Sequence, residues 1–327
     1  MTAGPRLTAD PPDGRELGAR LRDRDLSAAP AVLNLVENRG DAAREQTNEL
    51  LASIAPSQLG GEAPAKIIGV TGPPGVGKST LLSRLVAQWR LRGRSVAVLT
   101  VDPSSRRSGG ALLGDRARIE RDPADSAVFI RSTAAGDRLG GLAPATRAAA
   151  TALAVAFDTV VIETVGVGQS ETEVADVADT VAVVVQPGSG DVLQFLKSGI
   201  MEIPDVLVVT KADLGQAATR AVSDLNAALR SLGSTATEVL AVSSIAPPSG
   251  ISELVDALDR HRAALALADR RVRSRRMHAL AEFIAEHGER GLRALGGRRA
   301  AERWLADQDP GADVTSLERA LERRAAG

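Results

Sequence analysis

One glycine-rich segment contains residue types that can bind a triphosphate. Residues 72–80 read Gly-Pro-Pro-Gly-Val-Gly-Lys-Ser-Thr, between an apolar run at 67–70 and a helical pattern that begins at Leu81. Glycines in such a turn let backbone N–H groups surround phosphate oxygens, and the helix N-terminus adds the positive end of its dipole. Lys78 is placed to reach the outer phosphates, and the Ser79 hydroxyl to bind Mg²⁺. The expected phosphate-binding residues are Gly72, Pro73, Pro74, Gly75, Val76, Gly77, Lys78, Ser79 and Thr80. A turn that binds nothing is the weaker interpretation.

Two further segments contain carboxylates suited to the metal. Asp102 and Asp115 lie in a polar, glycine-containing stretch that follows an apolar run, where they can hold water molecules around Mg²⁺. Glu163 ends another apolar run, where many P-loop proteins have the Asp that faces the metal. Beyond it, the Gly166 N–H can contact the γ-phosphate, and Gln169 is the candidate for orienting the attacking water. The expected catalytic residues are Lys78, Glu163 and Gln169, and the expected metal ligands are Ser79, Asp102, Asp115 and Glu163.

The segment Thr210-Lys211-Ala212-Asp213 has the residue types needed to select a purine base. The Asp213 carboxylate can accept hydrogen bonds from both N1–H and N2–H₂ of guanine. Adenine offers no such pair of donors, so a buried carboxylate would be left unpaired. The Lys211 stem can cover the base, and Ser243, Ser244 and Ile245 can complete the pocket through backbone groups. Taken alone, the segment is also compatible with an ordinary strand-to-helix turn.

Apolar runs alternate with helical patterns from residue 65 to residue 267. The runs are rich in β-branched residues and lack polar alternation, which is typical of strands covered on both faces. This pattern predicts an α/β fold with a doubly wound, mostly parallel sheet. We expect an N-terminal tail and helical extension at 1–64, a P-loop GTPase domain at 65–267, and a C-terminal helical arm at 268–327.

The composition excludes several classes of function. Forty basic and 41 acidic residues nearly cancel, and only 2% of residues are aromatic, so nucleic acid is not an expected partner. The chain has no cysteine, no signal peptide pattern and no apolar stretch long enough to span a bilayer, so we expect a cytoplasmic protein without a membrane partner. His261, His278 and His287 are interpreted as surface or packing residues. The basic run at 270–276 is interpreted as a solvated helix face.

The complete set of motifs resembles the MeaB/ArgK family, methylmalonyl-CoA mutase-associated GTPases of the SIMIBI class. The resemblance covers residues 32–267. It is carried by the glycine-rich segment, by Val-Asp-Pro-Ser-Ser at 101–105, by Glu-Thr-Val-Gly-Val-Gly-Gln-Ser-Glu at 163–171 and by Gln-Pro-Gly-Ser-Gly-Asp-Val-Leu-Gln at 186–194. The family's metal-facing carboxylates match Asp102, Asp115 and Glu163. The segment 186–202 matches the mobile loop that couples nucleotide state to the family's partner.

The resemblance implies a homodimeric G protein that binds GTP and Mg²⁺. Such a protein gates loading, protection or reactivation of an adenosylcobalamin-dependent methylmalonyl-CoA mutase. Thr210 replaces the Asn usual in the guanine motif, so ATP stays an alternative nucleotide. Val167 replaces the water-orienting Gln of Ras-like proteins, so we expect hydrolysis to be slow alone and faster with a partner. A P-loop kinase that phosphorylates a transport-associated protein and a nucleotide-binding scaffold are the alternative functions.

Overall fold

The chain forms two compact units. The computed structural model describes residues 11–102, 119–134, 142–164, 170–188, 204–233 and 236–326. One unit consists of residues 64–274, and the other combines residues 1–63 with residues 275–327. We call the first the sheet unit and the second the terminal unit.

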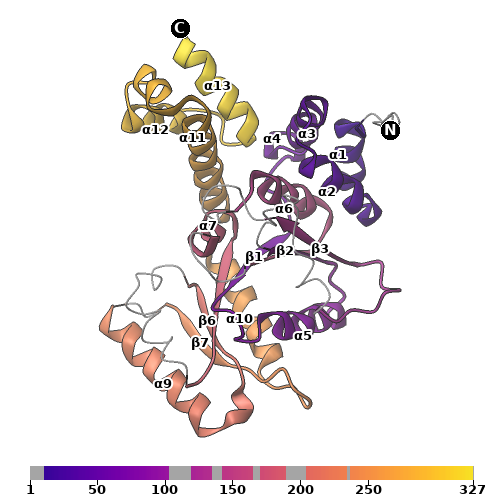
Figure 1. Ribbon diagram of the computed structural model, residues 1–327, viewed down its shortest axis with the longest axis vertical. Coiled ribbons are helices and arrows are strands. Elements are labelled where there is room, and N and C mark those ends of the chain that lie inside the picture. The colour runs from indigo at the N-terminus through magenta and orange to yellow at the C-terminus, as the bar shows by residue number, and fades with distance from the viewer. Residues whose placement is uncertain are drawn as a thin grey trace, which may run out of the picture. The chain divides into compact units, whose positions relative to one another are not determined.

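The sheet unit is built on parallel strands (Figure 1). The strands are β1 (Lys66–Thr71), β2 (Val96–Asp102), β3 (Val128–Ala134), β4 (Thr159–Thr164), β5 (Thr180–Val185), β6 (Val206–Val209) and β7 (Glu238–Ala241). Their order in the sheet is β3-β2-β4-β1-β5-β6-β7, and each pairing between these strands is parallel. Strand β1, which leads into the glycine-rich segment, therefore lies in the middle of the sheet. The predicted doubly wound fold is confirmed.

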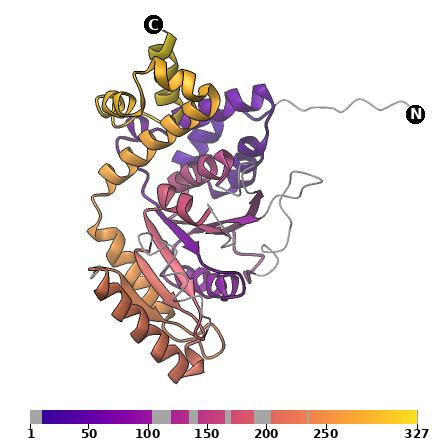
Figure 2. The ribbon, with the colours of Figure 1, turned by 60° about the vertical axis from the view of Figure 1, so that its left-hand side comes forward.

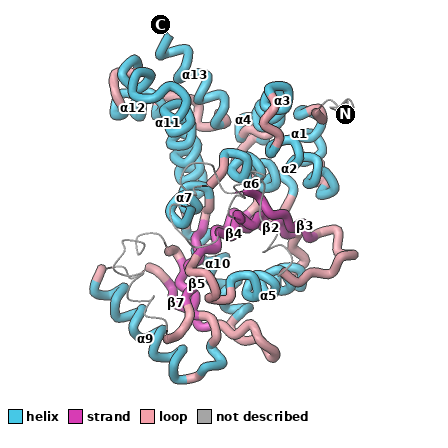
Figure 3. The backbone as a smooth tube through the Cα atoms, in the orientation of Figure 1, coloured by secondary structure: helices cyan, strands magenta, loops and turns pink. Residues whose placement is uncertain are grey.

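Helices cover both faces of this sheet. The sheet unit contains α5 (Lys78–Leu91), α6 (Pro144–Ala156), α7 (Ser170–Val177), η4 (Ala212–Leu214), α9 (Gln216–Ser231), α10 (Ile251–Ala264) and the start of α11 (Leu267–Ala294). Figures 1 and 2 show α5 and α6 on opposite faces, and Figure 3 shows the strands lying between helices. This is the layered arrangement expected of buried parallel strands.

Successive residues of β1 pack against the helices on opposite faces of the sheet. Ile68 and Val70 point into a core formed with α5 and α10, which includes the fully buried Trp89. Gly69 faces the other way, where a Cβ atom would lie 2.8 Å from the Val174 side chain of α7. Glycine at position 69 therefore lets α7 approach the sheet closely.

A buried ion pair anchors the start of α11 to the sheet. Arg271 donates hydrogen bonds of 2.8 and 2.7 Å from Nε and Nη2 to the two carboxylate oxygens of Asp179, which is 1% exposed. The same carboxylate accepts a hydrogen bond from the N–H of Ile67 at 2.9 Å. The interpretation of residues 270–276 as a solvated face was therefore wrong for Arg271, which neutralises a buried charge.

The terminal unit is helical. It contains α1 (Gly14–Arg22), η1 (Leu26–Ala28), α2 (Ala29–Glu37), α3 (Asp41–Ser53), α4 (Pro56–Leu59), the end of α11, α12 (Arg298–Ala306) and α13 (Val314–Ala326). Phe283, Leu305 and Leu321 belong to a core shared by α11, α12 and α13. Arg275 and Glu62 form a two-bond ion pair, with nitrogen-to-oxygen distances of 2.9 and 2.7 Å. Among the described residues, no helix is both long enough and apolar enough to cross a membrane.

Candidate nucleotide-binding site

The segment between β1 and α5 has the backbone of a phosphate-binding turn. Gly72, Gly75 and Gly77 have φ values of 143°, 80° and 98°, a region that other residue types rarely adopt. Gly72 also has a steric requirement, because a Cβ atom there would lie 2.1 Å from the carbonyl oxygen of Val184. Helix α5 begins directly after this turn, so its unpaired N–H groups open toward the loop. These features suit an anion with several oxygens.

Lys78 is folded over the turn. The side chain is only 8% exposed, and its Nζ donates hydrogen bonds to the carbonyl oxygens of Gly72 at 2.7 Å and Pro73 at 3.1 Å. A short rotation of the ammonium group would exchange these carbonyls for phosphate oxygens. The lysine therefore stands at the position from which a P-loop lysine neutralises a triphosphate.

Ser79 and Glu163 come together although they are 84 residues apart. The Ser79 hydroxyl donates a hydrogen bond of 3.3 Å to Oε1 of Glu163, which is 4% exposed at the end of β4. Next to Glu163, the Thr164 hydroxyl donates a hydrogen bond of 2.8 Å to the Thr71 hydroxyl, which links the ends of β4 and β1. A hydroxyl and a carboxylate beside the phosphate turn are oxygen ligands of the kind that Mg²⁺ prefers. The residues present therefore fit the metal that the sequence motifs imply.

Thr210 joins the end of β6 to the phosphate turn. Its buried hydroxyl lies 2.7 Å from the carbonyl oxygen of Val76 and 3.0 Å from that of Val185. The hydroxyl is thus committed to the backbone of the protein. Thr210 therefore links the end of β6 to the phosphate turn and to the end of β5. Comparison of its motif with the usual guanine motif does not reveal this role.

Asp213 is exposed and oriented by a second loop. The Ser243 hydroxyl, which is buried, donates a hydrogen bond of 2.9 Å to Oδ1 of Asp213. Lys211 adopts a left-handed conformation with φ of 56°, and its Nζ donates a hydrogen bond to Oε1 of Gln186. The strand ends therefore bring together Asp213, Lys211 and Ser243 next to the phosphate turn, while Ile245 is 58% exposed.

Several expected site residues lie outside the described structure. They are Asp115, Gly166 and Gln169, together with the side chain of Asp102. The backbone of Asp102 ends β2, which pairs with β4 so that Val101 stands opposite Thr164. The main chain therefore leads Asp102 toward the edge of the sheet that carries Glu163.

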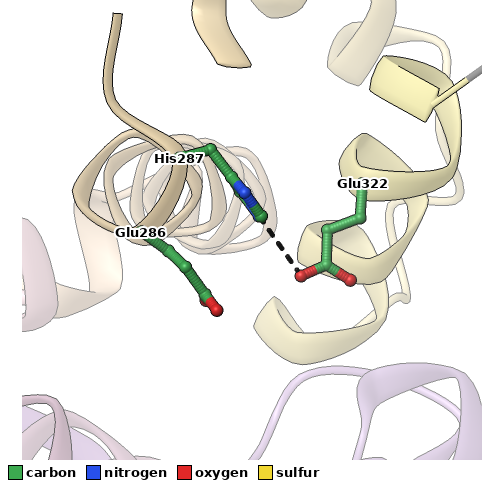
Figure 4. Close-up of side chains that lie close together, drawn as sticks. All are labelled: Glu286, His287 and Glu322. Atoms are coloured by element: carbon green, nitrogen blue, oxygen red, sulfur yellow. Dashed lines mark ion pairs between the residues drawn. The ribbon is translucent and has the colours of Figure 1, made fainter. Parts of the chain in front are cut away.

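The terminal unit contains a different cluster of ionisable groups. His287 Nε2 lies 3.5 Å from Oε1 of Glu322, and Glu286 is the third member of the group (Figure 4). Burial and the carboxylates of Glu282, Glu286 and Glu322 raise the pKa of Glu318 to about 7, while His287 lowers it. Exposed carboxylates often gather on helices without binding an ion, so this cluster alone defines no metal site.

A cavity in the terminal unit is also separate from the phosphate turn. Its volume is about 410 Å³, and its charged lining residues are Arg15, Glu45, Glu49 and Arg319. Two positive and two negative side chains give no net charge to attract a triphosphate. The candidate nucleotide site therefore lies in the sheet unit, where the turn, Lys78 and Glu163 come together.

A parallel sheet with this turn, Lys78, Ser79 and Glu163 at one edge defines a P-loop nucleoside triphosphatase. The family model "Methylmalonyl Co-A mutase-associated GTPase MeaB" matches residues 29–293. The chain belongs to this family and is a GTPase.

Relatives from distant organisms agree with this assignment. A Mycobacterium bovis protein named "Probable GTPase" is 40% identical over 256 residues, covering 76% of this chain and 75% of that protein. The mitochondrial "Methylmalonic aciduria type A homolog" of Caenorhabditis elegans is 38% identical over 215 residues, covering 63% of this chain and 54% of that protein. The solved structure of a "LAO/AO transport system kinase" is 26% identical with a TM-score of 0.62, covering 96% of this chain and 98% of the other.

Proposed function

We propose that this GTPase gates adenosylcobalamin loading, protection or reactivation of methylmalonyl-CoA mutase. The family description links its members to this mutase, and one relative is named after methylmalonic aciduria. The observation that carries the proposal is the pair formed by Ser79 and Glu163, 3.3 Å apart beside Lys78. These groups would contact the terminal phosphate and its metal, so hydrolysis would change the contacts available to the end of β4.

The proposed reaction is hydrolysis of the β–γ phosphoanhydride of GTP by water. Lys78 and the N–H groups of residues 72–80 bind the phosphates and stabilise the charge that develops on them. Ser79 and Glu163 would hold Mg²⁺, which supplies further neutralisation of the phosphate oxygens when bound. Asp102 and Asp115 are proposed as additional ligands, either directly or through water. Gln169 and Gly166 are proposed to position water and to contact the γ-phosphate.

Guanine is proposed to bind between Asp213, Lys211 and the segment that begins at Ser243. The hydrogen bond from Ser243 leaves Oδ2 of Asp213 and a second lone pair of Oδ1 available for N1–H and N2–H₂. Thr210 is proposed to stabilise this pocket, because its hydroxyl donates a hydrogen bond to the carbonyl oxygen of Val76 in the phosphate turn. Discrimination against ATP follows from the lack of a donor pair on adenine.

The proposed partners are methylmalonyl-CoA mutase and a second copy of this chain. Dimerisation is assigned to the C-terminal helices because the resemblance implies a homodimer. We expect the purified protein to have twice the mass of 33.9 kDa in light scattering. A monomer at micromolar concentration would contradict this part of the proposal.

The decisive experiment measures phosphate release from GTP with and without purified mutase. We expect slow release by the protein alone and faster release in the presence of the mutase. Cobalamin transfer to the apo-mutase, followed by its absorbance spectrum, should require GTP and fail with Lys78→Ala. Unchanged phosphate release and GTP-independent transfer would refute the proposed gating.

Phosphoryl transfer to a protein is the second candidate, because one structural relative carries the name of a transport system kinase. The same assay separates the two reactions. A kinase would move the γ-phosphate to an acceptor without releasing free phosphate.

A further inference from the structure

Arg84 connects helix α5, which follows the phosphate-binding turn, to the loop that follows β7. It lies on α5 less than two helical turns beyond Lys78. Its Nε donates a hydrogen bond of 2.8 Å to the carbonyl oxygen of Ser244. Ser244 belongs to residues 243–249, which follow β7 and which we call the base loop. A single side chain thus ties the phosphate site to the proposed base site.

The base loop is closed at its two ends. Ser243 and Ser249 exchange two backbone hydrogen bonds, each of 3.0 Å. The Ser243 side chain donates to Asp213 at 2.9 Å, so this end of the loop is fixed against the carboxylate. Arg84 holds the next residue along the loop. The position of the Ser244–Ile245 peptide is therefore determined from both sides.

The hydrogen bond to Arg84 also determines which way this peptide faces. In a planar trans peptide, the carbonyl group and the following N–H point in opposite directions. The Ser244 carbonyl points at Arg84, so the Ile245 N–H points away from the arginine. Among the described residues no hydrogen bond partner engages this N–H, and the Ile245 side chain is 58% exposed. The N–H is thus available as a donor.

Guanine needs one donor beside the Asp213 carboxylate. Its N1–H and N2–H₂ groups are donors, and the adjacent O6 atom is an acceptor on the same edge of the base. The Ser243 hydroxyl is already donating to Asp213, so the O6 atom requires a donor from the backbone of the loop. We propose that Arg84 is a positioning residue that turns the Ser244–Ile245 peptide so that the base loop donates to guanine O6. This proposal rests on the proposed guanine site and deepens it.

The test compares nucleotides that differ from GTP in one base atom. In 6-thio-GTP a sulfur atom, which is a weaker acceptor, replaces O6, whereas inosine triphosphate lacks only the N2 amino group. Affinities are measured by calorimetry with Mg²⁺ for the wild type, Arg84→Ala and Arg84→Lys. Arg90→Ala is the matched control, because Arg90 lies on the same helix and donates from Nε to Asp125, outside the base loop.

We expect the wild type and Arg90→Ala to prefer GTP over 6-thio-GTP by about fivefold to tenfold, the effect of one hydrogen bond. Arg84→Ala should reduce this preference to about twofold or less, and Arg84→Lys should restore part of it. The preference for GTP over inosine triphosphate, which reports on Asp213, should persist in every variant.

Equal weakening of all three nucleotides by Arg84→Ala would mean that the arginine only stabilises the fold, and the inference would be wrong. It would also be wrong if the wild type did not distinguish GTP from 6-thio-GTP. A wild type that binds inosine triphosphate as well as GTP would instead contradict the role proposed for Asp213. The two nucleotide ratios therefore separate failure of this inference from failure of the proposed guanine site.

Discussion

At the scale of single residues, Asp213 is the residue proposed to select the base. Asp213→Asn exchanges one acceptor for a donor, which suits the O2 and N1–H of xanthine better than the two donors of guanine. We expect GTP affinity to fall about 10–100-fold, because one hydrogen bond is replaced by two donors facing each other and the remaining one no longer goes to a charged group. Affinity for xanthosine triphosphate should rise. A competition assay against a fluorescent nucleotide measures both, and unchanged preference for GTP would contradict the assignment.

Glu163 is the residue at which the metal requirement should appear. Glu163→Gln keeps the shape of a side chain that is 4% exposed but removes its charge. We expect the Mg²⁺ concentration for half-maximal GTP hydrolysis to rise about 10–100-fold, as for other groups that support a metal. The matched control is Glu238→Gln, on β7, where the glutamate pairs with Arg260. A magnesium dependence that is the same in both variants would remove Glu163 from the site.

At the scale of elements, Thr210 couples β6 to the phosphate turn. Thr210→Val replaces the hydroxyl by a methyl group of similar size and leaves the carbonyls of Val76 and Val185 without this donor. We expect a loss of about 1–2 kcal/mol in the free energy of unfolding and weaker GTP binding. Thr210→Ser retains the hydroxyl and should lose much less. Urea unfolding and nucleotide titration of the two variants provide the measurement; equal behaviour would show that the hydroxyl is dispensable.

The elements were predictable from sequence where the signal is local. The apolar runs at 96–101, 159–162 and 206–210 predict strands, because β-branched runs of this length suit buried parallel strands. The structure has strands at 96–102, 159–164 and 206–209. The short helix α4 was missed because it occupies a segment of polar and turn-forming residues. The helix α7 was not predicted because its first residues, Ser170 and Glu171, belong to the motif at 163–171, which was interpreted by its chemistry alone.

The candidate site was predictable from the sequence only where its residues are consecutive. The phosphate turn is encoded by consecutive residues, so its glycines and Lys78 could be selected from the sequence. The roles of Arg84 and Arg271 depend on partners 160 and 92 residues away. A lone arginine on a helix has no pattern that distinguishes a solvated side chain from one that holds a distant loop or a buried carboxylate. Packing of the whole sheet unit is needed to bring these partners together.

At the scale of the whole molecule, stability should depend on pH through Glu318. Burial and neighbouring carboxylates raise its pKa from 4.5 to about 7 in the folded protein. The folded state therefore binds this proton more tightly than the unfolded state, and the associated stability is present below pH 4.5 and lost as the pH rises through about 7. Glu318→Gln should be more stable than the wild type at pH 8, by about 1–2 kcal/mol after allowance for solvent screening, and the difference should shrink at pH 5.

Thermal unfolding of the full chain at both pH values tests this expectation. Glu302→Gln is the control, because Glu302 is an exposed partner of Arg298 on α12. The same difference between Glu318→Gln and the wild type at pH 5 and pH 8 would show that Glu318 titrates as an ordinary surface carboxyl.

The terminal unit is assembled from both ends of the chain, and this arrangement makes the sheet unit an insertion in topological terms. The polypeptide passes between the units twice, after residue 63 and before residue 275. The two-bond ion pair between Glu62 and Arg275 holds these crossing points next to each other. A few added residues would therefore bridge them, and the catalytic insert can be excised or exchanged while its host keeps a continuous backbone.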